Sequence, residues 1–378
     1  YQGTMLLNLI FIAELAAVQG YDLYALSVNG KTLHTAVKFL LDAVDNPAVV
    51  LGYAAEDARH GRRMHRSGSD YYQAHGPVAD QHECGDHSVR ALYLLAGVDD
   101  LVRHGVDGLA IAAEAQWRSA TGRRMYVTGG FASTQDGERF TVDHDLPNRA
   151  AYTETCAAIA GALVAHRRLR CRRDAQAGAI LERCLHNGML AGLSLDGEHY
   201  HYANPLEVVP GEDPQHKRWT GRADSVARKA WYGCACCPPN IARILASLGG
   251  YIAIREGDDL DLDLHIGCRI DSDDWTLRIS GDPVSTGRCE IRIDRVPAGG
   301  RLGLRRPDWS TEVTVDGAAV ADDDGYVRIA VVPGQTLAVD FHLRAERLFA
   351  DPRISDNANR VALRRGPLVY CQEACDHA

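Results

Sequence analysis

NIARILASLGGYIA (residues 240–253) and LDLDLHIG (residues 260–267) decide the fold, because the spacing of apolar residues changes between these two stretches. The first stretch repeats its apolar residues at intervals of three and four, and the second places them at every other position. An interval of three or four puts apolar side chains on one face of a helix, whereas strict alternation puts them on one face of a strand. We therefore expect the chain to pass from helices to strands near residue 255.

The segments on either side continue the two patterns. Upstream, helical spacing recurs in MLLNLIFIAELAAVQG (5–20), LHTAVKFLLDAV (33–44), HSVRALYLLAGVDDLV (87–102), AAYTETCAAIAGALVAHRRL (150–169) and AQAGAILERCLHNGMLAGL (175–193). Downstream, alternation recurs in WTLRIS (275–280), CEIRID (289–294), TEVTVDG (311–317), YVRIAVV (326–332), TLAVDFHL (336–343) and RVALRRGPLVY (360–370). Helices and strands that are segregated along a chain argue against a doubly wound α/β sheet. We predict a multi-domain chain of the all-α plus all-β class, with a helical domain over residues 1–255 and a β-sandwich over residues 256–378.

Composition narrows the classes of partner. With 46% hydrophobic and 24% charged residues, the 378-residue chain has enough apolar material for one large or two ordinary folded domains. A net charge of -9 argues against a nucleic-acid or anionic-membrane surface, and the apolar stretches are shorter than the ~20 residues that a membrane span needs. Small, neutral or acidic partners are compatible with this charge.

Cysteine content and the first residue bear on the compartment. Eleven cysteines are too few for a disulfide scaffold in a chain of this length, and an odd number cannot all pair within one molecule, which favours free thiols or metal ligands. We expect a cytoplasmic location, with a removed signal peptide left open because the chain begins at Tyr1 and not at methionine.

GCACCPPN (residues 233–240) places three cysteines within four positions, directly before an apolar helix. Proline is favoured in the first turn of a helix, so Cys236 and Cys237 are expected at or just ahead of a helix N-terminus. The unpaired amides there favour anions and lower the pKa of a thiol. The alternative is that these cysteines are ordinary packing residues or form a disulfide.

A second pair of metal-binding residue types, Glu154 and Cys156, lies in AYTETCAAIA. Residues two apart do not share a helix face, so both side chains can reach one ion only from an irregular or opening turn. One carboxylate and three thiolates would suit Zn²⁺. Without the other cysteines, Glu-x-Cys is a weak metal signal.

Three further polar residues are candidates for a ligand site. Glu138 lies in the glycine-rich, loop-like stretch TGGFASTQDGERF (128–140), where a carboxylate can line a cleft, although most such glutamates are solvated. His75 and His87 lie at or near helix starts and could face a cavity or be structural histidines. The run EHYHYANPLE (198–207) is either a sugar-binding wall or an ordinary hairpin, and we favour the hairpin.

Several of these pieces, in this order, resemble glycoside hydrolase family 127 and its close relatives. They are YYQAHGPV (71–78), DHSVRALYLLAG (86–97), TGGFASTQDGERF (128–140), DLPNRAAYTETCA (145–157), ERCLHNGMLAGLSLDG (182–197), YANPLE (202–207), GCACCPPNIARILASLGGYI (233–252), LRRPDW (304–309), GYVRI (325–329) and RVALRRGPLVYC (360–371). The resemblance extends from about residue 70 to the end, whereas residues 1–55 fit poorly. The family has further barrel helices upstream, including a histidine-bearing stretch near the sugar, and we do not recognise them in this sequence. The barrel is therefore either complete or incomplete.

The resemblance implies an (α/α) helical barrel followed by β-sandwich domains, and the release of β-linked L-arabinofuranose from a non-reducing end. It implies that Cys236 is the nucleophile, Glu138 is the acid/base, and His75 and His87 hold sugar hydroxyls. The implied zinc ligands are Glu154, Cys156, Cys236 and Cys237. Two displacements at one carbon predict net retention of configuration. The expected partner is an oligosaccharide or glycoconjugate, and a homodimer through the sandwich is open.

Two other functions are compatible with parts of this sequence. One is a catalytically inactive protein, carbohydrate-binding or structural, in which zinc ties the CCPPN helix to the ETC helix. The other is a polysaccharide lyase, which residues 8–25 and 33–44 suggest through a loose likeness to the helical toroid of alginate lyases. The polar residues expected of a lyase site are missing from that segment.

Overall fold

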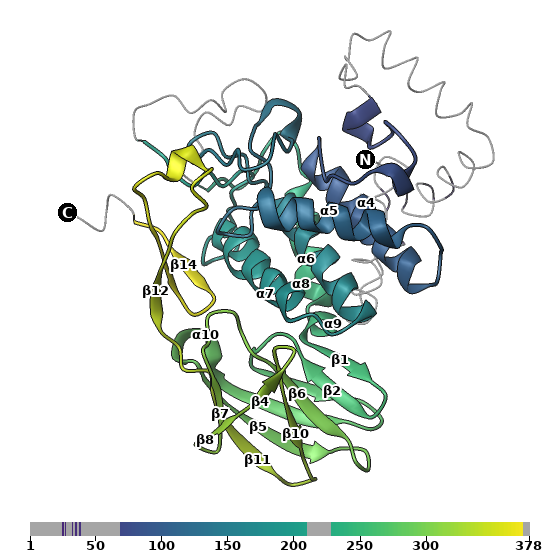
Figure 1. Ribbon diagram of the computed structural model, residues 1–378, viewed down its shortest axis with the longest axis vertical. Helices are drawn as coiled ribbons and strands as arrows, with labels where there is room; N and C mark the ends of the chain where they lie inside the picture. The colour runs from purple at the N-terminus through teal and green to yellow at the C-terminus, as the bar shows by residue number, and fades with distance from the viewer. Residues whose placement is uncertain are drawn as a thin grey trace.

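The computed structural model describes residues 69–209 and 228–372, together with the single residues 25, 27, 32, 35 and 38. Apart from these single residues, the two helices predicted over residues 5–20 and 33–44 lie outside the described residues. Within the described residues, helices come first along the chain and strands follow. Most of the strands gather at the end of the molecule away from the helices, whereas the last strands, from residue 345 on, run beside the helical region (Figure 1). The predicted order of helices and strands is therefore confirmed.

The helical region contains α4 (Ser88–Arg103), α5 (Ala110–Arg123), α6 (Thr155–Cys171), α7 (Ala175–Arg183), α8 (Cys237–Ser247) and α9 (Gly249–Ile252). Short helical turns are η1 (Ser69–Tyr72), η2 (Val78–Asp80), η3 (Asp136–Glu138), η4 (Cys184–Met189) and η5 (Leu190–Gly192). Helix α6 is at the centre, since it packs against α4, α7 and α8. Its residues are almost all buried, as expected of a helix that lies in a core.

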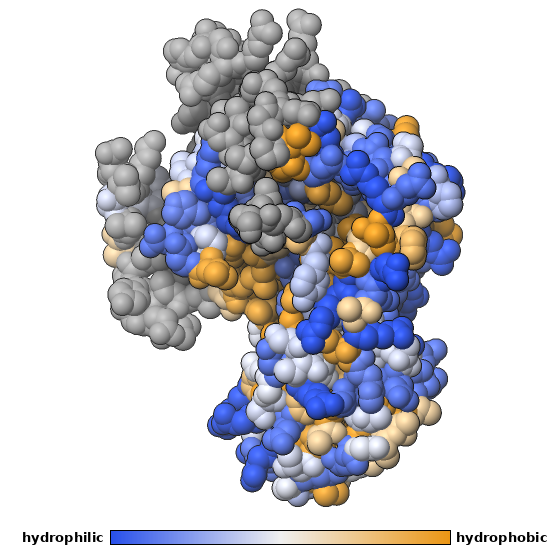
Figure 2. Space-filling view, turned by 90° about the vertical axis from the view of Figure 1, so that its left-hand side faces the viewer, coloured by the Kyte–Doolittle hydropathy of each residue, from blue (hydrophilic) through white to orange (hydrophobic). Residues whose placement is uncertain are grey.

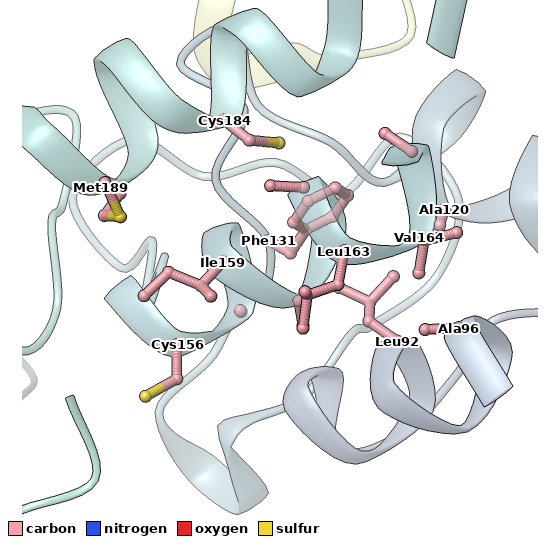
Figure 3. Packing of buried hydrophobic residues seen from close by; sticks show 14 of the residues in the cluster. Leu92, Ala96, Ala120, Phe131, Cys156, Ile159, Leu163, Val164, Cys184 and Met189 are labelled. Carbon is pink, nitrogen blue, oxygen red and sulfur yellow. The ribbon is translucent and has the colours of Figure 1, made fainter. Parts of the chain in front are cut away.

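The core of this region forms where α4 and α6 face each other. Leu92 of α4 and Ile159 and Leu163 of α6 belong to one buried cluster with Phe131, which comes from the glycine-rich loop (Figure 3). A side chain on Gly161 of α6 would collide with the Phe131 ring, so a glycine there lets the loop approach the helix. Cys156 belongs to the same cluster and so lies on the inner side of the first turn of α6.

The strands form three sheets. The first has the order β1-β2-β6-β10-β9 and contains β1 (Ala253–Glu256), β2 (Asp259–Leu262), β6 (Arg301–Arg305), β10 (Tyr326–Ala330) and β9 (Asp322–Asp323). The second has the order β3-β4-β5-β11-β7-β8 and contains β3 (Cys268–Asp271), β4 (Thr276–Asp282), β5 (Arg288–Arg295), β11 (Thr336–Asp340), β7 (Val313–Val315) and β8 (Ala318–Val320). The third contains β12 (Ala345–Leu348), β13 (Ala362–Arg365) and β14 (Leu368–Tyr370). A short helix, α10 (Pro283–Thr286), joins β4 to β5, and η8 (Ser355–Asn357) precedes β13.

Alternation of buried and exposed residues explains how the two larger sheets pack against each other. In β5, Cys289, Ile291 and Ile293 are buried and the residues between them are exposed. They share one apolar cluster with Leu260 and Leu302 of the other large sheet. The predicted alternation of the strands is thus confirmed. The (α/α) barrel, the β-sandwich and the domain boundary at residue 255 stay predictions. Among the described residues, none of the helices combines the length and the apolar character that a membrane crossing requires.

A buried ionic contact joins α7 to β6. The Arg305 side chain is completely buried, its guanidinium lies 3.1 Å from a Glu182 oxygen, and its Nε donates to the Asp263 carbonyl over 2.7 Å. Trp309 Nε1 donates to the other Glu182 oxygen over 3.0 Å. Breaking such a buried pair leaves an uncompensated charge and is strongly destabilising. This contact therefore fixes the β-sheet region against the helix that leads into η4.

Gly178 of α7 makes this approach possible, since a Cβ at that position would overlap the Arg305 side chain. We predict that Gly178→Ala lowers the free energy of unfolding by about 1–3 kcal/mol, as for other overpacked cores. Gly97→Ala is the control: Gly97 is also inside a helix, nothing would contact its Cβ, and alanine there is expected to stabilise by up to about 1 kcal/mol. Urea denaturation of both variants measures the difference, and equal midpoints would contradict the overlap.

Candidate active site

Four potential metal ligands from two helix starts converge in the helical region. One ligand atom from each of Glu154, Cys156, Cys236 and Cys237 lies within 4.8 Å of the others. Glu154, Cys156 and Cys237 are buried, while Cys236 is partly exposed. This group is the one that the sequence predicted as a metal site, and its geometry shows that it can hold a metal ion.

Helix starts bring the four residues together. Glu154 is the extended N-cap residue of α6 and Cys156 is in the first turn, so the opening-turn geometry that their spacing required is confirmed. Cys236 is the N-cap residue of α8, and Cys237 is the first helical residue, followed by two prolines. Because proline lacks an amide hydrogen and has a helical φ, it fits the first turn and ends the loop at the cysteines.

The distances fit a tetrahedral ion with three sulfur ligands. Metal–sulfur bonds of about 2.3 Å place two sulfurs of a zinc tetrahedron about 3.8 Å apart. Cys156 Sγ and Cys237 Sγ are 3.6 Å apart, and Cys236 Sγ and Cys237 Sγ are 3.8 Å apart. Cys236 Sγ is 3.4 Å from Glu154 Oε1. Burial also raises the pKa of Cys237 well above its usual value, so holding this thiol ionised requires a compensating cation.

Glu138 lies in η3, the short turn of the glycine-rich loop. Its backbone has φ +52°, and the preceding Gly137 has φ +72°. A left-handed backbone is costly for a residue with a side chain, and such strain gathers at functional sites. The Tyr152 hydroxyl donates to Glu138 Oε1 over 3.0 Å, and His87 Nε2 lies 3.1 Å from Glu138 Oε2. One carboxylate oxygen therefore accepts a hydrogen bond, and the other has the His87 ring beside it.

The two predicted sugar-binding histidines have different surroundings. His87 is the N-cap of α4, where its Nδ1 accepts from the Arg90 amide over 3.4 Å while its Nε2 faces Glu138. A nitrogen that accepts carries no proton, so this arrangement places the imidazole proton on Nε2, which lies close to the carboxylate without hydrogen-bond geometry. His75 is exposed in the bend after η1. Among the described residues, no hydrogen bond or ion pair joins His75 to Glu138 or to the cysteines.

Two tyrosines that the sequence did not mark as site residues connect Glu138 to the cysteines. Tyr152 and Tyr202 are both buried, with ring centroids 6.2 Å apart. The Tyr202 hydroxyl lies 3.0 Å from Cys236 Sγ. A continuous chain of contacts therefore runs from Cys236 through both tyrosines to Glu138.

Tyr202 comes from the run in which we favoured a hairpin. Leu193 and Tyr200 pair as antiparallel neighbours, so a hairpin does form there. Ala203 pairs with Glu154, and this bridge places Tyr202 beside the metal-ligand group. The one signal for Tyr202 in the sequence was the alternation of tyrosine with histidine in HYHYA. In the structure Tyr200 and Tyr202 are buried, while His199 and His201 are less so.

Comparison with known proteins identifies the relatives. Residues 14–250 match the model of the β-L-arabinofuranosidase GH127 catalytic domain, and residues 345–378 match the glycoside hydrolase family 127 C-terminal domain. The first match begins at residue 14 and so includes most of the segment 1–55 that we expected to fit poorly. A non-reducing end β-L-arabinofuranosidase of Bifidobacterium longum subsp. longum is 38% identical over 326 residues, which cover 81% of this chain and 48% of that protein.

Solved structures agree with this result. A GH127 β-L-arabinofuranosidase from Geobacillus stearothermophilus T6 is 32% identical with a TM-score of 0.73, and the match covers 91% of this chain and 60% of that one. A second GH127 β-arabinofuranosidase is 29% identical with a TM-score of 0.73, covering 93% of this chain and 57% of that one. The chain thus spans about half the length of its Bifidobacterium relative. Because one family model accounts for residues 14–250, more than half of the sequence, the chain belongs to glycoside hydrolase family 127.

Proposed function

We propose that the protein is a retaining exo-glycoside hydrolase that releases β-linked L-arabinofuranose, or a related furanoside, from the non-reducing end of an oligosaccharide or glycoconjugate. The observation that carries this proposal is the partly exposed Cys236 sulfur, which lies in a cluster of three cysteines and one glutamate and is connected through Tyr202 and Tyr152 to Glu138. The names of the relatives support the choice of sugar.

Cys236 is the proposed nucleophile. Of the three clustered cysteines it is the partly exposed one, whereas Cys156 and Cys237 are buried. In the first step its sulfur forms a bond to the anomeric carbon as the bond from that carbon to the leaving oxygen breaks. Glu138 donates a proton to the departing oxygen, so the leaving group departs as a neutral alcohol.

The second step reverses these roles. Glu138, now a carboxylate, accepts a proton from water while the water oxygen attacks the anomeric carbon and the carbon–sulfur bond breaks. The Cys236 thiolate is regenerated and the sugar leaves with its original configuration. Tyr152 holds one Glu138 oxygen throughout while His87 lies beside the other, and we propose that His75 and His87 also contact sugar hydroxyls.

Zinc is the metal we propose for the site, held by Glu154, Cys156, Cys236 and Cys237. A bound zinc ion would keep the Cys236 sulfur deprotonated at neutral pH. The residues present fit it, because three sulfur donors and one carboxylate at these separations suit a tetrahedral ion that prefers nitrogen and sulfur ligands.

The finer architecture belongs to the same proposal. We propose that the helices form an (α/α) barrel over residues 1–255 and that the strands form a β-sandwich domain over residues 256–378. The shared apolar core of the two larger sheets supports the sandwich. A cytoplasmic location and a homodimer remain predictions, and light scattering of the purified chain tests the dimer.

A structural role for the metal group is the second candidate. Cys156 and Cys237 join the first turns of α6 and α8, so a bound ion would tie these helices together without any catalysis. Such a protein would bind carbohydrate, or serve as structure, and would hydrolyse no glycoside. The polar surroundings of Glu138 favour the enzyme, because a metal that served only as a helix tie would not require them.

The experiment that separates the two candidates follows hydrolysis of a chromogenic β-L-arabinofuranoside by NMR. We expect the β-configured sugar to appear first, before mutarotation, with the α-linked substrate left intact as the control. Initial release of the α-sugar would exclude the double displacement. If neither β-L-arabinofuranosides nor related furanosides are cleaved, the structural role replaces the proposed activity.

A further inference from the structure

We propose that Tyr71, Tyr72 and Arg90 form the subsite for the leaving group, and that the leaving group is itself a sugar ring that stacks on Tyr72. This inference rests on the proposed function, because it extends the assignment of Glu138 as the acid. It goes further in naming the residues and the kind of leaving group.

The three side chains form one preorganised cluster. The Tyr71 and Tyr72 rings meet edge to face, with centroids 5.1 Å apart and planes at 79°. The Arg90 guanidinium carbon lies 4.9 Å from the Tyr71 centroid and 5.0 Å from the Tyr72 centroid. Cation–π contacts and edge-to-face packing each add to the stability of such a cluster. A platform held in this way loses little side-chain entropy when a ligand binds.

The cluster lies directly beside Glu138. The Tyr71 ring packs edge to face against the His87 ring, with centroids 4.9 Å apart, and His87 Nε2 is 3.1 Å from Glu138. Glu138 also contributes to the raised pKa of Tyr71, whose main cause is burial. The contacts therefore continue from Glu138 through His87 to Tyr71 and then to Tyr72.

The direction of the reaction assigns this side to the leaving group. In a displacement, the nucleophile and the leaving oxygen are on opposite sides of the anomeric carbon, and the acid contacts the leaving oxygen. Cys236 is at one end of the contact chain, Glu138 is in the middle, and Tyr72 is at the other end. Tyr71 reaches Glu138 through His87, whereas Cys236 reaches it through Tyr202 and Tyr152, so we place the group attached to the leaving oxygen on the side of Tyr71 and Tyr72.

Exposure identifies Tyr72 as the surface that a sugar meets. It is 48% exposed, although it is an aromatic residue within a packed cluster. The C–H groups of a sugar ring carry a small positive charge and pack against the negative face of an aromatic ring. Figure 2 shows one face of the molecule, on which apolar and hydrophilic side chains lie side by side.

The test compares two substrates with the same β-L-arabinofuranosyl group. One is a disaccharide whose leaving group is a second arabinofuranose, and the other is the methyl glycoside. We expect Tyr72→Ala to lower the ratio of kcat/KM for the disaccharide to kcat/KM for the methyl glycoside by about tenfold, because the lost stacking acts on the sugar leaving group. Tyr72→Phe keeps the ring and should keep the wild-type ratio.

Tyr370→Ala is the matched control, because Tyr370 is similarly exposed at 53% but lies in β14 of the C-terminal sheet. Its ratio should equal that of the wild type. An unchanged ratio in Tyr72→Ala, with wild-type enzyme active on both substrates, overturns the subsite and leaves the proposed function standing. If the wild type cleaves neither substrate, the proposed function fails and the subsite fails with it.

Discussion

Replacement of Cys236 by alanine is expected to abolish hydrolysis, with kcat on a β-L-arabinofuranoside at least about 10⁴-fold below wild type. The variant removes the atom that would bond to the anomeric carbon, while Cys156, Cys237 and Glu154 stay in place. Steady-state kinetics on the purified variant measure the loss. Circular dichroism shows whether the fold survives, since the altered residue is the N-cap of α8.

Cys171→Ala is the control for this experiment. Cys171 is also a free cysteine, but it is exposed at the end of α6, and its sulfur is 3.8 Å from the Asp99 carbonyl. We expect this variant to keep wild-type kcat. If Cys236→Ala hydrolyses the substrate at the wild-type rate, a thiolate nucleophile is excluded.

Replacement of Glu138 by glutamine has the second-largest expected effect. General acid–base catalysis contributes about 10²–10⁴-fold, so kcat should fall by that factor on a substrate with a poor leaving group. A substrate with a strongly activated phenol as leaving group needs no protonation and should keep a fast first step. The expected signature is a burst of phenol followed by slow turnover, because the second step still lacks its base.

Added azide separates a lost acid/base from a damaged fold. Azide attacks the anomeric carbon without a base, so it should speed the second step of Glu138→Gln and give a glycosyl azide of retained configuration. Glu198→Gln, in an exposed hairpin, is the control and should behave as wild type. A uniform loss on both leaving groups, with no response to azide, would contradict the role of Glu138.

The sequence predicted those features that depend on local spacing. Apolar periodicity separated helices from strands near Ala253, where β1 begins. Two prolines after Cys237 predicted the start of α8, and the two-residue spacing of Glu154 and Cys156 required the turn in which they lie. These predictions worked because helix starts are determined by a few neighbouring residues.

Other features depend on contacts between distant segments and could not be read from spacing. Tyr202 reaches Cys236 across 34 positions, and His87 reaches Glu138 across 51. The burial of Arg305 against Glu182 is equally remote in sequence. A tyrosine or an arginine in such a sequence is usually a surface or packing residue. Only the folded structure therefore shows that it belongs to the site or to the core.

The central claim is that a metal-held thiolate performs the reaction, and metal content measured together with turnover tests it most directly. Elemental analysis of the purified, reduced chain is paired with hydrolysis of a chromogenic β-L-arabinofuranoside before chelation, after chelation and after zinc is returned. The account predicts stoichiometric zinc, loss of turnover with the metal, and recovery when zinc is added. Absence of zinc from the active, reduced protein, or full turnover after complete removal of the metal, would contradict it.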